Sequence, residues 1–276
     1  MKRNFHGSWA IVICLIAIPV TVFAQGAGDV TDGDLNVDHG QVNWTERTIT
    51  ATGSGAPDLK APNVAVARLG AERVAKMDAL RNIMETLKGV QLDSEITIEN
   101  ELVTHSKMRS KIQGVIRRFK VLKTKYYSDG GVDLIVQVSL DGQLGSNLVK
   151  PGDKGSKLST EGKSKHTGLI IDARGLKVMP ALSPKILDES GNVIYDSEFL
   201  GKEALEARGV IAYFKDFKSA KKNKRVAASP LVLKALKLKE GSKTDIILSN
   251  ADAEKLRDPG SNLKYLADGK VLVVTD

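Results

Sequence analysis

Hydrophobic and polar positions along the chain predict two α+β segments with a polar stretch between them. The first segment opens with alternating residues over 44–52, typical of a strand, and Gly53-Ser54-Gly55-Ala56-Pro57 should end it. A helix over about 63–88 follows, because apolar positions recur at steps of three and four: Val66, Gly70, Val74, Met77, Leu80, Met84 and Leu87. We expect this stripe to pack on a sheet.

The rest of the first segment is predicted to be mostly β. Alternation favours a strand over 90–103, a polar loop or short helix over 104–113, and a β-rich stretch over 115–127. Ser128-Asp129-Gly130-Gly131 is a hairpin turn signal, and residues 132–140 alternate as the paired strand. These elements predict one α+β domain over residues 44–141, in the order strand, helix, strand, strand, strand.

Residues 142–165 are rich in Gly, Ser and Lys, which is the composition of a flexible linker. A second α+β domain is predicted over 166–276. Its expected strands are 167–175, 178–187, 193–195, 210–214, 232–238, 243–248 and 270–275. Its expected helices are 202–208 and 250–256, the second with Asn250 as N-cap, and 215–225 should be a basic loop.

The N-terminus has the pattern of a secretory signal peptide over residues 1–24. Lys2 and Arg3 precede an apolar run without charge, and Val22-Phe23-Ala24 offers the small residues that a signal peptidase recognises. The apolar run is too short to span a bilayer, so we expect cleavage, no transmembrane anchor in the mature chain, and a periplasmic or extracellular location. Residues 25–43 are polar and are predicted to form a disordered leader.

Cysteine usage and charge narrow the chemistry further. The single cysteine, Cys14, lies inside the signal peptide, so the mature chain should have no disulfide, thiol nucleophile or cysteine metal site. The whole chain carries +8, and removing Lys2 and Arg3 leaves +6. This charge favours anionic partners such as lipid, lipopolysaccharide or cell-wall polymer, although surplus solvated lysines also explain it.

Two basic clusters are candidate contacts for an anionic partner. The first lies within 106–127 and includes Arg117, Arg118, Lys120 and Lys123, with aromatic residues interleaved. An edge strand guarded by lysines explains it better than a nucleic-acid surface, so we expect no nucleic acid. The second cluster includes Lys221, Lys222, Lys224 and Arg225, where a solvated loop is favoured over a membrane-binding segment.

The remaining motifs favour a protein that is not an enzyme. Gly53-Ser54-Gly55 invites comparison with a phosphate loop, but it lacks the spacing and the lysine, and a flexible turn is favoured. His39, His105 and His166 are scattered, and no catalytic set, metal site or cofactor site is predicted. A hydrolase assembled from residues that cannot be paired by sequence stays open as a third alternative.

Residues 49–140 resemble the LPP-twenty lipoprotein family of bacterial envelope proteins and the related domains of the flagellar assembly proteins P and T. The resemblance rests on Ala51–Pro57, on the alanine-rich helix through Ala71 and Asp78–Arg81, and on 88–92, 111–116 and the hairpin 126–140. Residues 167–195 and 245–275 are similar to the extra domain of longer exported members. Ile13-Cys14 departs from a lipobox, so a periplasmic or secreted form is expected rather than a lipid-anchored one.

The resemblance implies a strand-helix-strand-strand unit and a non-enzymatic envelope protein with a structural or assembly role, flagellar or outer-membrane associated. Its expected partners are envelope proteins or copies of the chain itself. The alternative function is a binding module for anionic lipid, lipopolysaccharide or cell-wall polymer.

Overall fold

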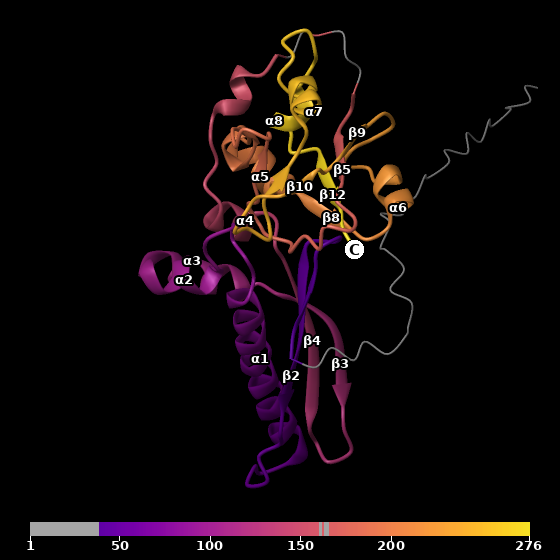
Figure 1. Ribbon diagram of the computed structural model, residues 1–276. Coiled ribbons are helices and arrows are strands. Elements are labelled where there is room, and N and C mark those ends of the chain that lie inside the picture. The colour runs from indigo at the N-terminus through magenta and orange to yellow at the C-terminus, as the bar shows by residue number, and fades with distance from the viewer. Residues whose placement is uncertain (1–38, 160–161, 163–165) are drawn as a thin grey trace, which may run out of the picture. The chain divides into compact units, whose positions relative to one another are not determined.

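The computed structural model describes residues 39–159, 162 and 166–276. The predicted signal peptide and most of the leader lie outside the described residues. The described chain has the predicted α+β fold class, with a second domain from residue 168 (Figure 1).

The N-terminal domain is an antiparallel sheet with a long helix on one face. The strand order is β1-β2-β4-β3, and the strands are β1 (Gln41–Asn43), β2 (Thr48–Gly55), β3 (Lys120–Tyr126) and β4 (Val132–Ser139). Helix α1 (Val64–Lys88) lies along β2 and contacts β4 as well (Figure 1). The predicted hairpin is present between β3 and β4, where Gly130 adopts a φ of +91°. The prediction of a disordered leader is wrong for its last residues, because Gln41 to Asn43 form β1 and pair with Thr50 to Thr48.

Helix α1 approaches β2 through its smallest side chains. Ala71, Ala75 and Ala79 are fully buried at four-residue spacing. A Cβ atom on Gly53 would lie 2.2 Å from the backbone oxygen of Ala75, and one on Gly55 would lie 2.0 Å from that of Ala71. Only glycine permits this contact between backbones. The glycines therefore belong to strand β2, and the prediction that they form a turn ending the strand is wrong.

The predicted contact stripe of α1 is also wrong over most of its length. Val66, Val74 and Met77 are 45%, 51% and 69% exposed, whereas Leu87 alone of the predicted stripe is fully buried. The physical reason is the close approach to β2, because a side chain larger than alanine does not fit between the two backbones. Over the stretch of α1 that faces Gly53 and Gly55, the larger apolar residues are left on the other side of the helix, and large buried residues return only at Ile83 and Leu87.

A turn and a short helix replace the strand predicted over 90–103, and a helix is present over most of 104–113, where a loop or short helix was predicted. Asp93 folds the chain into a turn, since its carboxylate accepts the backbone N–H of Glu95 at 2.8 Å and of Ile96 at 3.0 Å. Thr97 then caps α2 (Ile98–Thr104), and α3 (Ser106–Ile116) follows directly. Side-chain capping of this kind outweighs alternation of polar and apolar residues. The β-rich stretch correspondingly starts at Lys120 rather than at residue 115.

The stretch predicted as a linker is structured over its first half. It contains α4 (Gln143–Leu148) and the 3-10 helix η1 (Lys154–Lys157). Leu144, Leu148 and Val149 are buried among the core residues. Gly and Ser dominate the composition here, but these three apolar residues decide where the segment packs.

The C-terminal domain contains two four-stranded sheets. The sheet of order β8-β12-β5-β9 is parallel throughout, and its strands are β5 (Leu169–Asp172), β8 (Ala212–Phe214), β9 (Leu231–Lys234) and β12 (Val271–Val274). The mixed sheet of order β10-β11-β6-β7 is built from β6 (Ile186–Leu187), β7 (Val193–Tyr195), β10 (Lys237–Leu238) and β11 (Ile246–Ile247). Every residue of β12 is buried, as expected for a central parallel strand.

The helices of this domain are short. They are η2 (Ser197–Phe199), α5 (Lys202–Arg208), α6 (Phe217–Lys222), α7 (Asn250–Lys255) and α8 (Lys264–Ala267). Two predictions are corrected here. The expected basic loop contains α6, which begins at the N-cap Asp216 and buries Ala220 on the parallel sheet. The N-cap of α7 is Ser249 rather than Asn250, and its hydroxyl accepts the N–H of Asp252.

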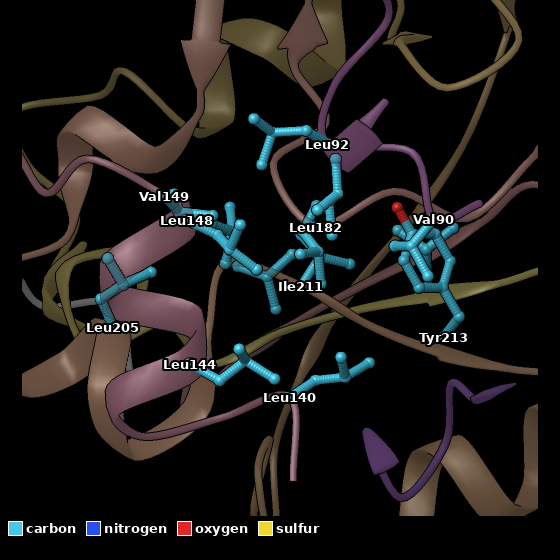
Figure 2. Packing of buried hydrophobic residues seen from close by; sticks show 14 of the residues in the cluster. Val90, Leu92, Leu140, Leu144, Leu148, Val149, Leu182, Leu205, Ile211 and Tyr213 are labelled. Carbon is cyan, nitrogen blue, oxygen red and sulfur yellow. The ribbon is translucent and has the colours of Figure 1, made fainter. Parts of the chain in front are cut away.

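The core continues from the first sheet into the C-terminal domain. Figure 2 shows Leu140, Leu144 and Leu148 beside Leu205 and Ile211, so residues of α4 join side chains of both domains. Polar contacts reinforce the joint: Arg47 pairs with Asp141 at 2.6 Å and donates to the backbone oxygen of Ile211 at 2.5 Å. The two domains therefore share one packed interior.

Candidate functional site

A groove lies between the C-terminal half of α1 and the helices α2 and α3. Its volume is about 430 Å³. Its apolar lining residues are Met77, Leu80, Met84, Leu102 and Ile116, and its polar lining residues are Arg81, Glu85, Lys88, Arg109, Gln113 and Arg117. The site therefore combines an apolar lining with a largely cationic one.

The helix phase of α1 explains the apolar lining. Because alanines occupy the side of α1 that faces β2, Leu80 and Met84 point away from the sheet and are half-buried. Leu102 of α2 and Ile116 of α3 are buried, and their side chains complete the lining from the other wall. The same alanine–glycine packing that closes the domain core thus leaves larger apolar side chains to line the groove.

The charges around the groove are unevenly paired. The carboxylate of Glu85 accepts a hydrogen bond from Lys88 at 2.7 Å, and Asp78 lies 3.7 Å from Arg81. Arg109 and Arg117 are exposed and have no carboxylate partner within the part of the chain that the structure describes. Two unpaired guanidinium groups beside apolar side chains suit a ligand that carries both an anionic group and an apolar body.

The first predicted basic cluster is divided by the structure. Arg117 lines the groove, whereas Arg118 donates to the side chain of Gln143 at 2.8 Å. Lys120 and Lys123 lie on β3, which is an edge strand, at register positions opposite Gln137 and Ile135. Those β4 positions alternate with the core-facing ones, so both lysines belong to the sheet face away from α1. Of these four residues, only Arg117 lines the groove.

The second predicted cluster also separates into two kinds of residue. Lys221, Lys222 and Lys224 are exposed at and just beyond the end of α6. Arg225 instead donates to four backbone carbonyls, those of Gly269 at 2.8 Å, Arg208 at 2.6 Å, Gly209 at 3.0 Å and Val210 at 3.1 Å. Burial, together with the charge of Arg47, lowers the pKa of Arg225 to about 9. Arg225 thus fixes the protein interior, and its assignment as a partner contact is wrong.

Sequence reasoning missed most of the groove. Arg81 and Lys88 lie outside both predicted basic clusters, Arg109 lies within the first cluster but was not among its named contacts, and the apolar lining was assigned to the core. One signal was available: Ala71, Ala75 and Ala79 recur at four-residue spacing after a Gly-x-Gly strand. Small residues at such spacing allow a helix backbone to approach a strand closely. They therefore indicate which face of the helix is turned toward the sheet.

A second hollow of about 620 Å³ lies between the turn before α2 and the segment after α4. Its charged lining residues are Asp93, Glu101, Lys150, Asp153 and Glu198. Glu198 is paired with Lys154, and Glu101 lies 3.5 Å from His105. Across the described residues no three His, Cys, Asp or Glu side chains are grouped so that they could hold a metal ion. The first groove is the more distinctive of the two because it joins unpaired cations to apolar side chains.

Comparison with known proteins bears on the C-terminal domain. Residues 168–276 match the family model described as the second domain of Treponema pallidum Tp0624. None of the curated proteins matches the chain. In the described parts of the chain, no helix is both long enough and apolar enough to cross a membrane. The groove lies in the N-terminal domain, outside the matched residues.

Proposed function

We propose that this protein is an exported, non-catalytic component of the bacterial cell envelope with a structural or assembly role, and that it acts by binding through the α1–α2–α3 groove. The observation that carries the proposal is the composition of the groove, in which Arg109 and Arg117 stand beside Met77, Leu80 and Met84. Such a site can hold an amphipathic anionic partner.

The groove residues suit binding better than turnover. Arginine is an obligate donor that stays protonated at neutral pH, so it holds an anion but accepts no proton from a substrate. The carboxylate that lines the groove, Glu85, is already engaged by Lys88. General acid–base chemistry needs a group that titrates near the working pH and reaches the substrate.

The location and role rest on sequence. The pattern of residues 1–24 supports export, and the resemblance of residues 49–140 to the LPP-twenty family and to flagellar assembly proteins P and T supports an assembly role in the envelope. The arrangement β2–α1–β3–β4 fits the strand-helix-strand-strand unit that this resemblance implies. A second candidate function, a binding module for anionic lipid, lipopolysaccharide or cell-wall polymer, is favoured by the unpaired guanidinium groups of Arg109 and Arg117.

Site-specific photo-crosslinking in the producing bacterium tests the proposal. A photoreactive residue replaces Gln113, which is exposed and lines the groove, and a matched one replaces Lys221 on α6. We expect the protein in the envelope fraction, with a mature N-terminus near Gln25, and crosslinks to envelope components from position 113 but not from position 221.

Two outcomes would contradict the proposal. One is a cytosolic protein that retains its first 24 residues and forms no crosslink from position 113. The other is steady hydrolysis of an ester, peptide or glycan by the purified protein, which would favour the third alternative, a hydrolase.

A further inference from the structure

The outward side of α1 carries a continuous stripe at helical spacing. Val66, Leu69, Arg73, Met77, Leu80 and Met84 follow one another at steps of three or four residues, so they share one face of the helix. Leu69 is 56% exposed, and Met77 is more exposed still. Helix α3 lies beside the C-terminal end of this stripe, across the groove. We call this surface the α1–α3 face and define it by the stripe together with Arg109 and Arg117.

The fold does not need the exposed apolar residues of this face. The contact between α1 and the sheet is made by Ala71, Ala75 and Ala79, and by Ile83 and Leu87 farther along. Three further residues at or near the N-terminal half of α1 are large, apolar and exposed: Leu59, Val64 and Val74. Contiguous exposed apolar side chains on a soluble surface are characteristic of an interaction site.

Cations outnumber free acids on the α1–α3 face. Arg109 and Arg117 are exposed, and no acidic residue occurs between Glu101 and Asp129. Glu85 also lines the groove, but its carboxylate accepts a hydrogen bond from Lys88 at 2.7 Å. Glu72 accepts the hydroxyl of Tyr126 at 3.0 Å, and Asp78 accepts the backbone N–H of Ser54 at 3.0 Å. The face therefore presents apolar groups together with an excess of cations.

We propose that the α1–α3 face docks on the surface of an anionic phospholipid bilayer. Arg73, Arg109 and Arg117 bind lipid phosphates, while Leu69 and Met77 enter the headgroup region. The inference rests on the proposed function and names the partner of the same site. Charge complementarity selects the bilayer, because a basic helical surface with apolar side chains is the usual signature of interfacial binding.

A second copy of this chain is a poor occupant of the same face. A two-fold contact would place one cationic face, with Arg73, Arg109 and Arg117, against the same face of the second copy, and like charges across an interface oppose association. A bilayer instead supplies the phosphates and the apolar interior at the depth that the two kinds of side chain require. The groove between α1 and α3, which Met77, Arg109 and Arg117 line, then lies at the level of the headgroups.

Vesicle flotation tests the proposal with the protein purified in the form in which the cell accumulates it. We expect binding to vesicles of phosphatidylcholine with phosphatidylglycerol, and no binding to phosphatidylcholine alone. Binding should fall as salt rises, because the screening length shrinks from about 10 Å at about 0.1 M to about 3 Å at about 1 M. The variant Arg73→Gln/Arg109→Gln/Arg117→Gln should lose about 100-fold in partitioning, at about fivefold for each cation removed.

The matched control is Lys221→Gln/Lys222→Gln/Lys224→Gln, which removes the same charge from the end of α6. It should change partitioning by less than about fivefold, since those lysines lie outside the docking face. Insertion is read separately from Met77→Cys labelled with an environment-sensitive dye, because the sequence has no cysteine beyond Cys14. The emission should shift to the blue on anionic vesicles, and a label at Lys222→Cys should not respond.

Three results would overturn the inference. They are failure to bind anionic vesicles at low salt, equal losses in the two triple variants, and an unresponsive label at position 77. If the crosslinks from position 113 then lead to an acidic envelope protein, the membrane is the wrong partner but the proposed envelope function stands. A cytosolic location would instead defeat the proposed function, whatever the vesicles show.

Discussion

Helix α1 and the region around β12 place their arginines and their large apolar side chains in opposite ways. Helix α1 turns alanines to the sheet and leaves Leu69 and Met77 in solvent beside Arg73. In the C-terminal domain, the apolar residues of β12 are all buried, and Arg225 points inward to four backbone carbonyls. The first region exposes both kinds of side chain together, and the second uses both to hold the interior.

This difference separates residues that stabilise the fold from residues available to a partner. A cation that donates to four backbone carbonyls cannot bind an external anion without disturbing its surroundings. A cation on an exposed helix face can, and apolar side chains beside it add area that becomes buried on docking. The contrast predicts that substitutions at interior contacts will change stability, whereas substitutions on the exposed face will change binding.

A large effect is expected at the contact between α1 and β2. Gly53→Ala places a Cβ 2.2 Å from the backbone of both Ala75 and Ala79, so the helix must move away from the strand. We expect a loss of about 3 kcal/mol in the free energy of unfolding, at the upper end of overpacking effects. Urea unfolding followed by circular dichroism measures it.

The matched control is Gly70→Ala in the same helix. A Cβ at position 70 meets no atom within 4 Å, and alanine is the better helix former. This change should raise stability by about 0.5–1 kcal/mol. If both variants shift stability in the same direction, the proposed backbone contact is incorrect.

A smaller loss is expected when Arg225 is replaced. Arg225→Met leaves carbonyls of Arg208, Gly209, Val210 and Gly269 without their donor, which should cost about 2–3 kcal/mol. Lys222→Met, on the exposed side of α6, should change stability by less than about 0.5 kcal/mol. Chemical unfolding of both variants measures the two free energies of unfolding. Equal stabilities would contradict the interior role of Arg225 and would mean that its side chain is exposed.

The pH dependence of stability isolates a third, smaller contribution. Asp188 is 3% exposed and is held by Asn192 and by Arg257 at 2.8 Å. The side chain of Asn192 and the guanidinium of Arg257 lower the pKa of Asp188 from 3.8 to about 2. Because the folded pKa lies below the unfolded one, the unfolded state binds the proton first as pH falls.

The contribution of Asp188 is therefore complete above about pH 4 and is lost as pH falls toward 2. Asp188→Asn should be less stable than the wild type at neutral pH, and the difference should shrink over that window. Glu240→Gln, on an exposed turn, serves as the control. Urea midpoints at several pH values measure the effect, and a difference that persists unchanged at pH 2 would contradict the assignment.

Local signals predicted the elements that depend on local chemistry. The hairpin turn at Gly130 follows from a residue that adopts a positive φ, and it is present. The strand predicted over 90–103 failed because alternation alone does not reveal that Asp93 and Thr97 satisfy backbone N–H groups of a turn and a helix start. Polar side chains that bind their own backbone compete with β pairing.

The candidate site was harder to predict because it depends on the rotation of one helix. Both the outward stripe of α1 and its buried face have apolar residues at steps of three and four. The outward stripe has the larger residues, so hydrophobicity alone predicts that this stripe is the buried one. The close approach that selects the alanines depends on Gly53 and Gly55, two residues of another strand. Arg117 was identified by charge alone, whereas the groove that gives it a role depends on three helices packing together.

The smallest expected effect concerns Met77, and it tests the rotation of α1 directly. Met77 and Leu87 are both large and apolar and belong to the same predicted stripe, yet Met77 is 69% exposed and Leu87 is fully buried. Leu87→Ala should cost about 2–5 kcal/mol because it leaves a cavity in the core. Met77→Ala should change stability by less than about 0.5 kcal/mol, since it removes atoms that contact mainly water. Thermal and urea unfolding of the two variants give the comparison, and comparable losses at both positions would show that the stripe faces the sheet after all. If Met77→Ala leaves stability unchanged but partitions more weakly onto anionic vesicles, the Met77 side chain serves binding to the partner rather than stability of the fold.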